Sequence, residues 1–112
     1  MARTPANLKN TTQLSVSATD VVDAVTQNTQ TVIRTASFMN TGTSVRTITV
    51  YVVASGGSAG TTNILTTKTI AAGRSWNCIE LQGVVLTGGM KAQAAVDAGT
   101  DVNVNISGTT VV

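Results

Sequence analysis

The residues that most enzymes use for acid–base or nucleophilic chemistry are scarce in this chain of 112 residues. It contains no histidine, five acidic residues and one cysteine, Cys78. Histidine is the usual general base near neutral pH, so Cys78 lacks the partner that would activate it. Lys68 or Lys91 would have to be buried to act as a base. The sequence therefore predicts a protein that is not an enzyme and binds no cofactor, with Cys78 as a small apolar side chain in or near the core.

Four of the acidic residues are candidates for a cation site. Asp20 and Asp23 flank a Val-Val pair, and Asp97 and Asp101 lie four positions apart near the C-terminus. Oxygen ligands on loops suit Ca²⁺, but the chain has neither the spacing of an EF-hand nor another dense run of aspartates. We interpret these residues as solvated turn acids and predict no metal site, with a loop-bound cation as the alternative.

The segment 55–60, Ser-Gly-Gly-Ser-Ala-Gly, raises the question of a phosphate-binding loop. Such a loop needs G-x-x-x-x-G-K-[ST] before a helix, because its backbone N–H groups surround the phosphates while the lysine and hydroxyl hold the terminal phosphate and its metal. Here Gly60 is followed by two threonines and no lysine, and residues 63–70 are mostly β-branched or polar. The segment is therefore predicted to be an exposed connection between strands.

Charge and hydropathy argue against nucleic acid and membrane as partners. The net charge is +2, the basic residues are scattered, and there is one residue each of Trp, Tyr and Phe. Binding to nucleic acid needs clustered Lys and Arg or aromatic platforms for the bases. The first ten residues lack the apolar stretch of a signal peptide, and no run approaches the roughly 18 apolar residues of a membrane span. We expect synthesis in a cytoplasm, without a membrane partner.

The elements that must position these residues are strands. Apolar and polar residues alternate with a period of two in segments 47–54, 90–97 and 102–107, which is typical of strands with one buried face. Glycine and asparagine turn signals separate candidate strands near 12–17, 30–39, 45–54, 62–70, 74–81, 89–97 and 101–107, with short ones near 21–25 and 109–112.

This pattern predicts an all-β fold, an antiparallel β-sandwich or jelly roll of about seven to nine short strands. The predicted core includes Ile48, Val50, Val52, Met90, Val96, Val102, Val104 and Ile106. Residues 12–112 are expected to form the single domain. Residues 1–11, which contain the only proline, are expected to be a flexible arm that a partner orders.

The segment 74–81 contains the only tryptophan. Alternation puts Arg74, Trp76, Cys78 and Glu80 on one side of this candidate strand, so neither side is purely apolar or purely polar. Two interpretations stay open. Trp76 caps the core where the strand bends, or it anchors a contact between subunits, since tryptophan is enriched at the centres of interfaces.

Several segments together carry a resemblance to a known group of proteins. They are residues 31–36, 40–42, 45–53, 55–60, 70–73, 78–86 and 106–108. Over about residues 10–112 the chain resembles small structural proteins encoded by tailed bacteriophages. The resemblance implies a virion component with a β-sandwich or jelly-roll fold and no enzymatic activity. Some members of the group decorate or cement the capsid, and others belong to the neck, tail or fibres, so it assigns no binding residues.

Composition is consistent with a subunit of a large assembly, because charged residues make up only 11% of the chain and do little to keep sheet edges apart. We expect a capsid decoration or cement protein that binds the outside of a phage head as a homo-oligomer and contacts the major capsid protein. The alternative is a neck, tail or fibre component, including a receptor- or carbohydrate-binding module. The expected contact residues are Arg3 and Lys9 in the arm, together with Trp76.

Overall fold

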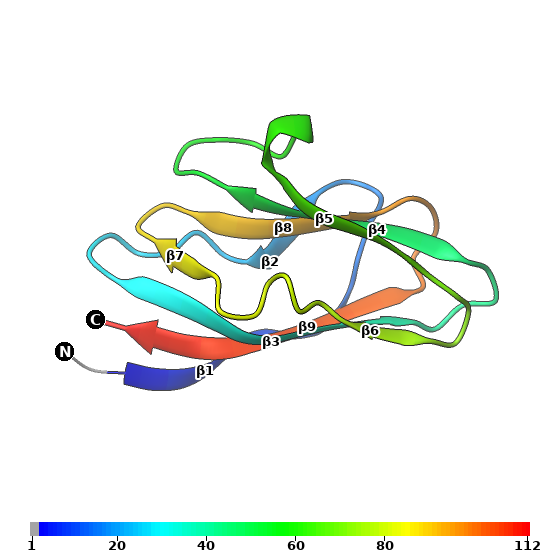
Figure 1. Ribbon diagram of the computed structural model, residues 1–112, viewed down its shortest axis with the longest axis horizontal. Coiled ribbons are helices and arrows are strands. Elements are labelled where there is room, and N and C mark those ends of the chain that lie inside the picture. The colour runs from blue at the N-terminus through cyan, green and yellow to red at the C-terminus, as the bar shows by residue number, and fades with distance from the viewer. Residues whose placement is uncertain (1–2) are drawn as a thin grey trace.

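The protein folds as two antiparallel sheets packed face to face (Figure 1), and its computed structural model describes residues 3–112. Sheet A has the strand order β1-β9-β3-β6, with β7 also paired to β3, and sheet B has the order β2-β8-β4-β5. The strands are β1 (Arg3–Gln13), β2 (Thr19–Val22), β3 (Gln30–Asn40), β4 (Arg46–Val53), β5 (Ile64–Ile70), β6 (Ser75–Asn77), β7 (Val85–Thr87), β8 (Lys91–Val96) and β9 (Val102–Val111). The predicted all-β sandwich is confirmed.

The helical content of the described residues is one 3₁₀ turn, η1 (Thr61–Asn63), at the entrance to β5. Asn63 holds this turn, because its side chain accepts a hydrogen bond from the Gly60 N–H at 2.9 Å and donates to the Ser58 carbonyl at 2.9 Å. No helix among residues 3–112 is long and apolar enough to cross a membrane.

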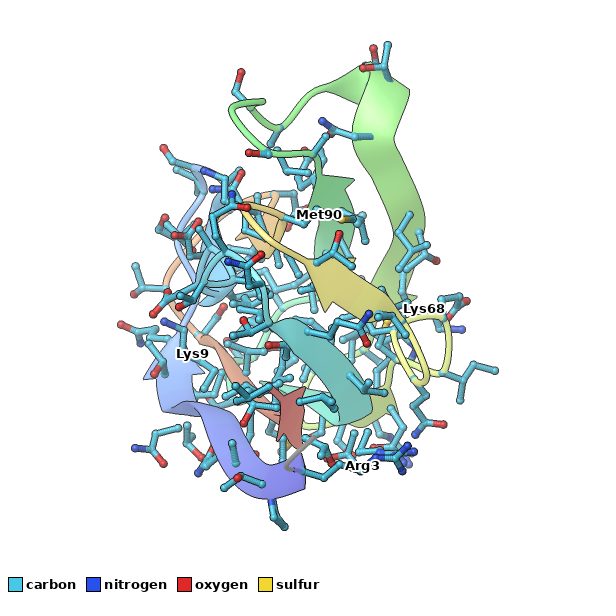
Figure 2. The ribbon with its side chains drawn as sticks, turned by 90° about the vertical axis from the view of Figure 1, so that its left-hand side faces the viewer. Arg3, Lys9, Lys68 and Met90 are labelled. Atoms are coloured by element: carbon cyan, nitrogen blue, oxygen red, sulfur yellow. The ribbon has the colours of Figure 1, made fainter. Side chains whose placement is uncertain are left out.

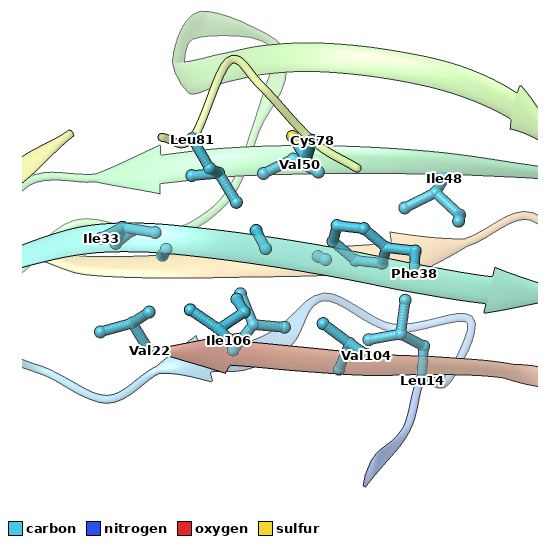
Figure 3. Packing of buried hydrophobic residues seen from close by; sticks show 14 of the residues in the cluster. Leu14, Val22, Ile33, Phe38, Ile48, Val50, Cys78, Leu81, Val104 and Ile106 are labelled. Atoms are coloured by element: carbon cyan, nitrogen blue, oxygen red, sulfur yellow. The ribbon is translucent and has the colours of Figure 1, made fainter. Parts of the chain in front are cut away.

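The core lies between the sheets and is built from small aliphatic side chains around one large ring, Phe38 (Figure 3). On β9, Val102, Val104 and Ile106 are buried, and the residues between them are partly exposed, as the period of two predicts. Six of the eight predicted core residues are buried: Ile48, Val50, Val96, Val102, Val104 and Ile106.

Two predicted core residues, Val52 and Met90, are only partly buried and pack against the rim of the core. Val52 lies near the end of β4, and Met90 precedes the first residue of β8, so each has core neighbours on one side only. Val53 does not follow the alternating pattern. It is fully buried but does not belong to the core cluster, and the turn at Gly57 lies next to its side chain.

Two β-bulges face each other across β9. On β3, Ile33 pairs with Gly108 and Thr35 with Ser107, which leaves Arg34 as the extra residue. The bulge reverses which residues face inward, so Ile33 is buried before it and Ala36 after it. On β1, Asn7 pairs with Ser107 and Lys9 with Ile106, which leaves Leu8 as the extra residue.

Gly108 lies between these bulges, inside a strand and not at the turn that the sequence suggested. The predicted strands 101–107 and 109–112 are one continuous strand, β9. A β-carbon at position 108 would collide with the carbonyl oxygen of Val32 and lie 2.9 Å from the Leu8 side chain. Glycine is therefore needed here for close approach of neighbouring strands.

The expected flexible arm over residues 1–11 differs from the structure. Residues 3–13 form β1, which pairs with β9 from Arg3 opposite Val111 to Gln13 opposite Asn103. The predicted strand 12–17 is correspondingly wrong, since β1 ends at Gln13. Hydrogen bonding to the long edge of β9 orders the segment although its own sequence has little apolar pattern. Met1 and Ala2 lie outside the described residues.

Candidate interaction surfaces

Within residues 3–112 the side chains enclose no pocket, and no three His, Cys, Asp or Glu side chains gather as metal ligands would. Cys78 is buried, as predicted, and burial raises the pKa of its thiol. A neutral thiol is a poor nucleophile, so this residue contributes packing in the folded chain.

Three of the four acidic residues considered for a cation site, Asp20, Asp97 and Asp101, have partners within the chain. Asp20 accepts a hydrogen bond from Gln93 Nε2 at 2.7 Å, and its carboxylate lies 4.0 Å from Lys91 Nζ. Asp101 accepts two hydrogen bonds from Arg46, at 2.9 Å from Nε and 3.2 Å from Nη2. The structure therefore uses these two carboxylates for contacts within the chain.

The Arg46–Asp101 pair ties together two loops at one end of the sandwich. The Thr41 N–H and hydroxyl both donate to the Asp101 carbonyl at 2.7 Å, and the Asp101 side chain packs over Gly42. The hydrogen bond from Arg46 lowers the pKa of Asp101. Asp97 belongs to the same end, where its carboxylate accepts a hydrogen bond from the Thr47 N–H at 3.0 Å.

Trp76 lies on β6, a short outer strand of sheet A. It is directly opposite Phe38 on β3, so the two side chains share the core-facing side of the sheet. Their rings stack with centroids 5.2 Å apart and planes 25° apart. This geometry supports Trp76 as a cap on the core, and part of the side chain remains accessible because it is only partly buried.

The predicted strand 74–81 ends early, at Asn77, and the chain then turns instead of extending. The Leu81 N–H bonds the Cys78 carbonyl at 3.2 Å, and the Gly83 N–H bonds the Ile33 carbonyl at 2.7 Å. The turn directs both Cys78 and Leu81 into the core (Figure 3) and leaves Ile79 68% exposed. It also leads into β7, a strand that the sequence analysis missed.

Several exposed apolar side chains belong to β5, to the turn after β6 and to β7. β5 ends the path of sheet B, as β6 ends that of sheet A, and the Thr66 hydroxyl on β5 donates to Glu80, in the turn after β6, at 3.4 Å. Of the seven exposed large hydrophobic residues among residues 3–112, four belong to β5, to the 78–84 turn or to β7. We call this set the β5-edge surface: Ile64, Leu65, Ile79 and Val85.

A charged residue of β5, Lys68, limits uncontrolled strand pairing at this edge. Lys68 on β5 is opposite Ile48, a core residue, so it is on the core-facing side of its strand, yet it is exposed. An inward-pointing charge on an outer strand is one way in which proteins prevent edge-to-edge aggregation. The apolar residues of this surface are therefore accessible while open-ended β5 pairing is disfavoured.

The three predicted contact residues do not form one surface. Arg3 is exposed and Lys9 partly buried on β1, at one edge of sheet A, whereas Trp76 lies on β6 at the other edge. Figure 2 shows Lys9 on β1 on the opposite side of the view from Lys68, and Arg3 at the bottom of the molecule. The sequence analysis missed the residues of the β5-edge surface. The signal available was the adjacent pair Ile64-Leu65, which breaks the alternation where β5 bulges.

Comparison with known proteins adds a likeness of fold. No family model and no curated protein matches the chain. Among solved structures, the chain is similar to a protein of the Bacillus endospore appendages, which form a family of disulfide-linked pili. The two share 17% identity with a TM-score of 0.53, over 97% of this chain and 87% of that one. The likeness is one of β-sandwich architecture.

Proposed function

We propose that this protein is a non-enzymatic structural protein of a tailed-phage particle, a decoration or cement protein that binds the outside of the head as an oligomer. The observation that carries the proposal is the β5-edge surface, whose residues Ile64, Leu65, Ile79 and Val85 are exposed on β5, on the 78–84 turn and on β7. Exposed large apolar side chains are one mark of a protein–protein contact where they form a patch. The proposed partners are the major capsid protein and further copies of the same chain, and the proposed location is the virion.

The outer faces of both sheets fit a crowded assembly. They present neutral hydroxyl and amide groups, with Thr47 bonded to Thr69 at 3.1 Å on sheet B and Thr35 bonded to Ser107 on sheet A. Faces with little charge let neighbouring copies approach without strong repulsion. Many weak contacts of this kind become a stable attachment when a particle presents many equivalent sites.

A fibre or tail component is the second candidate, and the fold likeness to a pilus protein favours it. That neighbour belongs to disulfide-linked pili, whereas Cys78 here is fully buried and its thiol is not accessible to a second copy. A fibre built from this chain would therefore be joined by non-covalent contacts.

Copy number separates the two candidates. Purified virions are expected to contain hundreds of copies of a head decoration protein, but only a few to a few tens of copies of a neck, tail or fibre component. Quantitative gel analysis and electron microscopy of the same preparation give the number and the position. Absence of the chain from purified particles would contradict both candidates.

The role of the β5-edge surface is tested with one charge. Ile79→Asp places a carboxylate in the proposed contact at a residue that is already exposed, so the fold is expected to remain intact. Binding to undecorated heads, measured by co-sedimentation, is expected to weaken about tenfold or more, which corresponds to about 1.4 kcal/mol.

The matched control is Thr67→Asp, an exposed residue on β5 outside the β5-edge surface, which is expected to bind as the unaltered chain does. Equal binding by Ile79→Asp and the unaltered chain would exclude this surface as the site of attachment.

A further inference from the structure

β1 is a long edge strand that contributes little to the core of the sandwich. Most of its eleven residues are exposed, and Leu8 is the residue through which it packs against the core. We propose that β1 is an exchangeable strand, which leaves its own β9 and pairs with β9 of a second copy when copies assemble. The inference deepens the proposed structural role and rests on it, but it does not depend on which particle the copies form.

Release of β1 leaves the core closed because the chain is anchored immediately after the strand. Leu14 is buried, and its N–H bonds the Val102 carbonyl at 2.8 Å. The Ser15 carbonyl accepts a further hydrogen bond from the Val96 N–H at 3.1 Å. A hinge between Gln13 and Leu14 would therefore free residues 3–13 while both anchors remain in place.

The pairing that would be broken is itself interrupted. The β1–β9 register shifts twice, between Asn7 and Lys9 and again between Lys9 and Thr12. Two of the side-chain hydrogen bonds between β1 and β9 are long, at 3.2 Å from Asn105 to Thr11 and 3.4 Å from the Thr110 hydroxyl to the Thr4 carbonyl. Bulges of this kind leave residues without a partner in the ladder and so lower the cost of detachment.

The vacated edge of β9 would be selective for the same strand. Without β1, the outward N–H and C=O groups of β9, ten residues long, would be unpaired and would favour a new strand. Leu8 occupies the space over Gly108, where no side chain projects, and it is the extra residue of the bulge. A matching strand needs an apolar residue and a bulge at that position, and β1 of a second copy supplies both.

Exchange also explains how copies can join through an edge that does not accept an additional strand. β1 contains Pro5, which has no N–H, together with the bulge at Leu8 and the charge of Lys9. Such an edge disfavours stacking of a second molecule onto β1. An extended strand of eleven residues reaches about 35 Å, which is long enough to lie along a neighbouring subunit.

Cysteine pairs split between two molecules test the exchange directly. One full-length chain carries Asn7→Cys and the other Ser107→Cys, at positions that are opposite each other in the β1–β9 register. The two chains are unfolded together, refolded at high concentration and oxidised. A disulfide-linked heterodimer is expected, with a yield at least about tenfold higher than for the out-of-register pair Asn7→Cys and Asn103→Cys.

Three controls fix the interpretation. A single chain with both Asn7→Cys and Ser107→Cys reports the closed form through an intrachain disulfide, and each single variant alone gives the background from Cys78. Adding Leu8→Asp to the Asn7→Cys chain is expected to lower the heterodimer yield several-fold, whereas adding Thr12→Asp, at an exposed position of the same strand, is not.

A heterodimer yield no higher than that of the out-of-register pair would overturn the exchange. That result would leave the proposed function standing, because Ile79→Asp binding and copy number measure particle attachment independently of β1. Conversely, efficient heterodimer formation with no chain in purified virions would retain the exchange and contradict the phage role.

Discussion

At the scale of single residues, backbone packing decides the role of Gly108. The sequence suggests a turn, since glycine commonly ends a strand, but at this position the neighbouring strand and the Leu8 side chain come too close for any β-carbon. The residue is therefore a requirement of tertiary packing that no local pattern reveals.

Gly108→Ala is expected to destabilise the fold by about 1–3 kcal/mol, because the added methyl group must displace the Val32 backbone or Leu8. Urea unfolding measures the change. Gly60→Ala is the matched control, since no atom lies within 4 Å of a β-carbon built there, and it is expected to change stability by less than about 0.5 kcal/mol. Equal unfolding midpoints for the two variants would contradict this account of β9.

The Arg46–Asp101 pair predicts how stability responds to acid. Arg46 lowers the pKa of Asp101 below its ordinary value of 3.8 in the folded chain. A carboxyl group with a lowered pKa stabilises the folded state above its unfolded pKa, and this contribution is lost as the pH falls through the folded pKa. The unaltered chain is therefore expected to lose stability below about pH 4.

Arg46→Met is expected to reduce this acid-dependent loss, because Asp101 would then titrate nearer its ordinary value. Urea midpoints at about pH 7 and about pH 2.5 give the comparison. Arg34→Met, at the exposed bulge of β3, serves as the control and is expected to keep the full pH dependence. An unchanged dependence in Arg46→Met would assign the acid sensitivity to other carboxylates.

At the scale of elements, a short outer strand and the turn after it close one side of the sandwich. β6 has only three residues, yet it brings Trp76 over Phe38, and the turn that follows inserts Cys78 and Leu81 into the same side of the core. A longer β6 would have kept Cys78 and Leu81 on opposite faces of one strand.

Trp76→Ala tests the capping role of β6. Loss of the ring stack and of the partly buried apolar area is expected to lower stability by about 1–3 kcal/mol, less than the 3–5 kcal/mol typical of removing a fully buried ring, as in Phe38→Ala. Thermal unfolding followed by circular dichroism measures both variants. A loss of oligomer with no change in monomer stability would instead identify Trp76 as a subunit contact.

At the scale of the whole molecule, low charge and exposed apolar side chains suit assembly by contact and not by electrostatic attraction. The net charge is only +2, and the four residues that define the β5-edge surface are apolar. Burial of apolar surface depends weakly on simple salts, whereas attraction between exposed charges is screened within about 10 Å at 0.1 M salt.

Particle binding is therefore expected to change less than about threefold between about 0.05 and 0.5 M sodium chloride, and to strengthen in sulfate, which is excluded from protein surfaces. Co-sedimentation across this series provides the measurement. A steep decrease in binding with sodium chloride would point to Arg3, Lys9 or other basic side chains as the principal contacts.

The β-sandwich class, most of the strands and most of the core could be predicted from the sequence alone. This prediction is possible because a strand with one buried face has apolar residues at every second position, as in Ile48 and Val50 or Val102 and Val104. The sequence also predicts Cys78 as an apolar residue, for a chemical reason: a lone cysteine without a histidine has no other common role.

The order of residues 3–13, the bulges and the β5-edge surface depend on tertiary contacts. Residues 3–13 became a strand because β9 offered an unpaired edge, and the opposed bulges at Leu8 and Arg34 exist because both strands adapt to β9. The β5-edge surface depends on which strands end each sheet and on a turn that exposes Ile79 while burying Leu81. Strand order and sheet edges arise from pairings between residues far apart in sequence, and a local alternation pattern contains no information about such pairings.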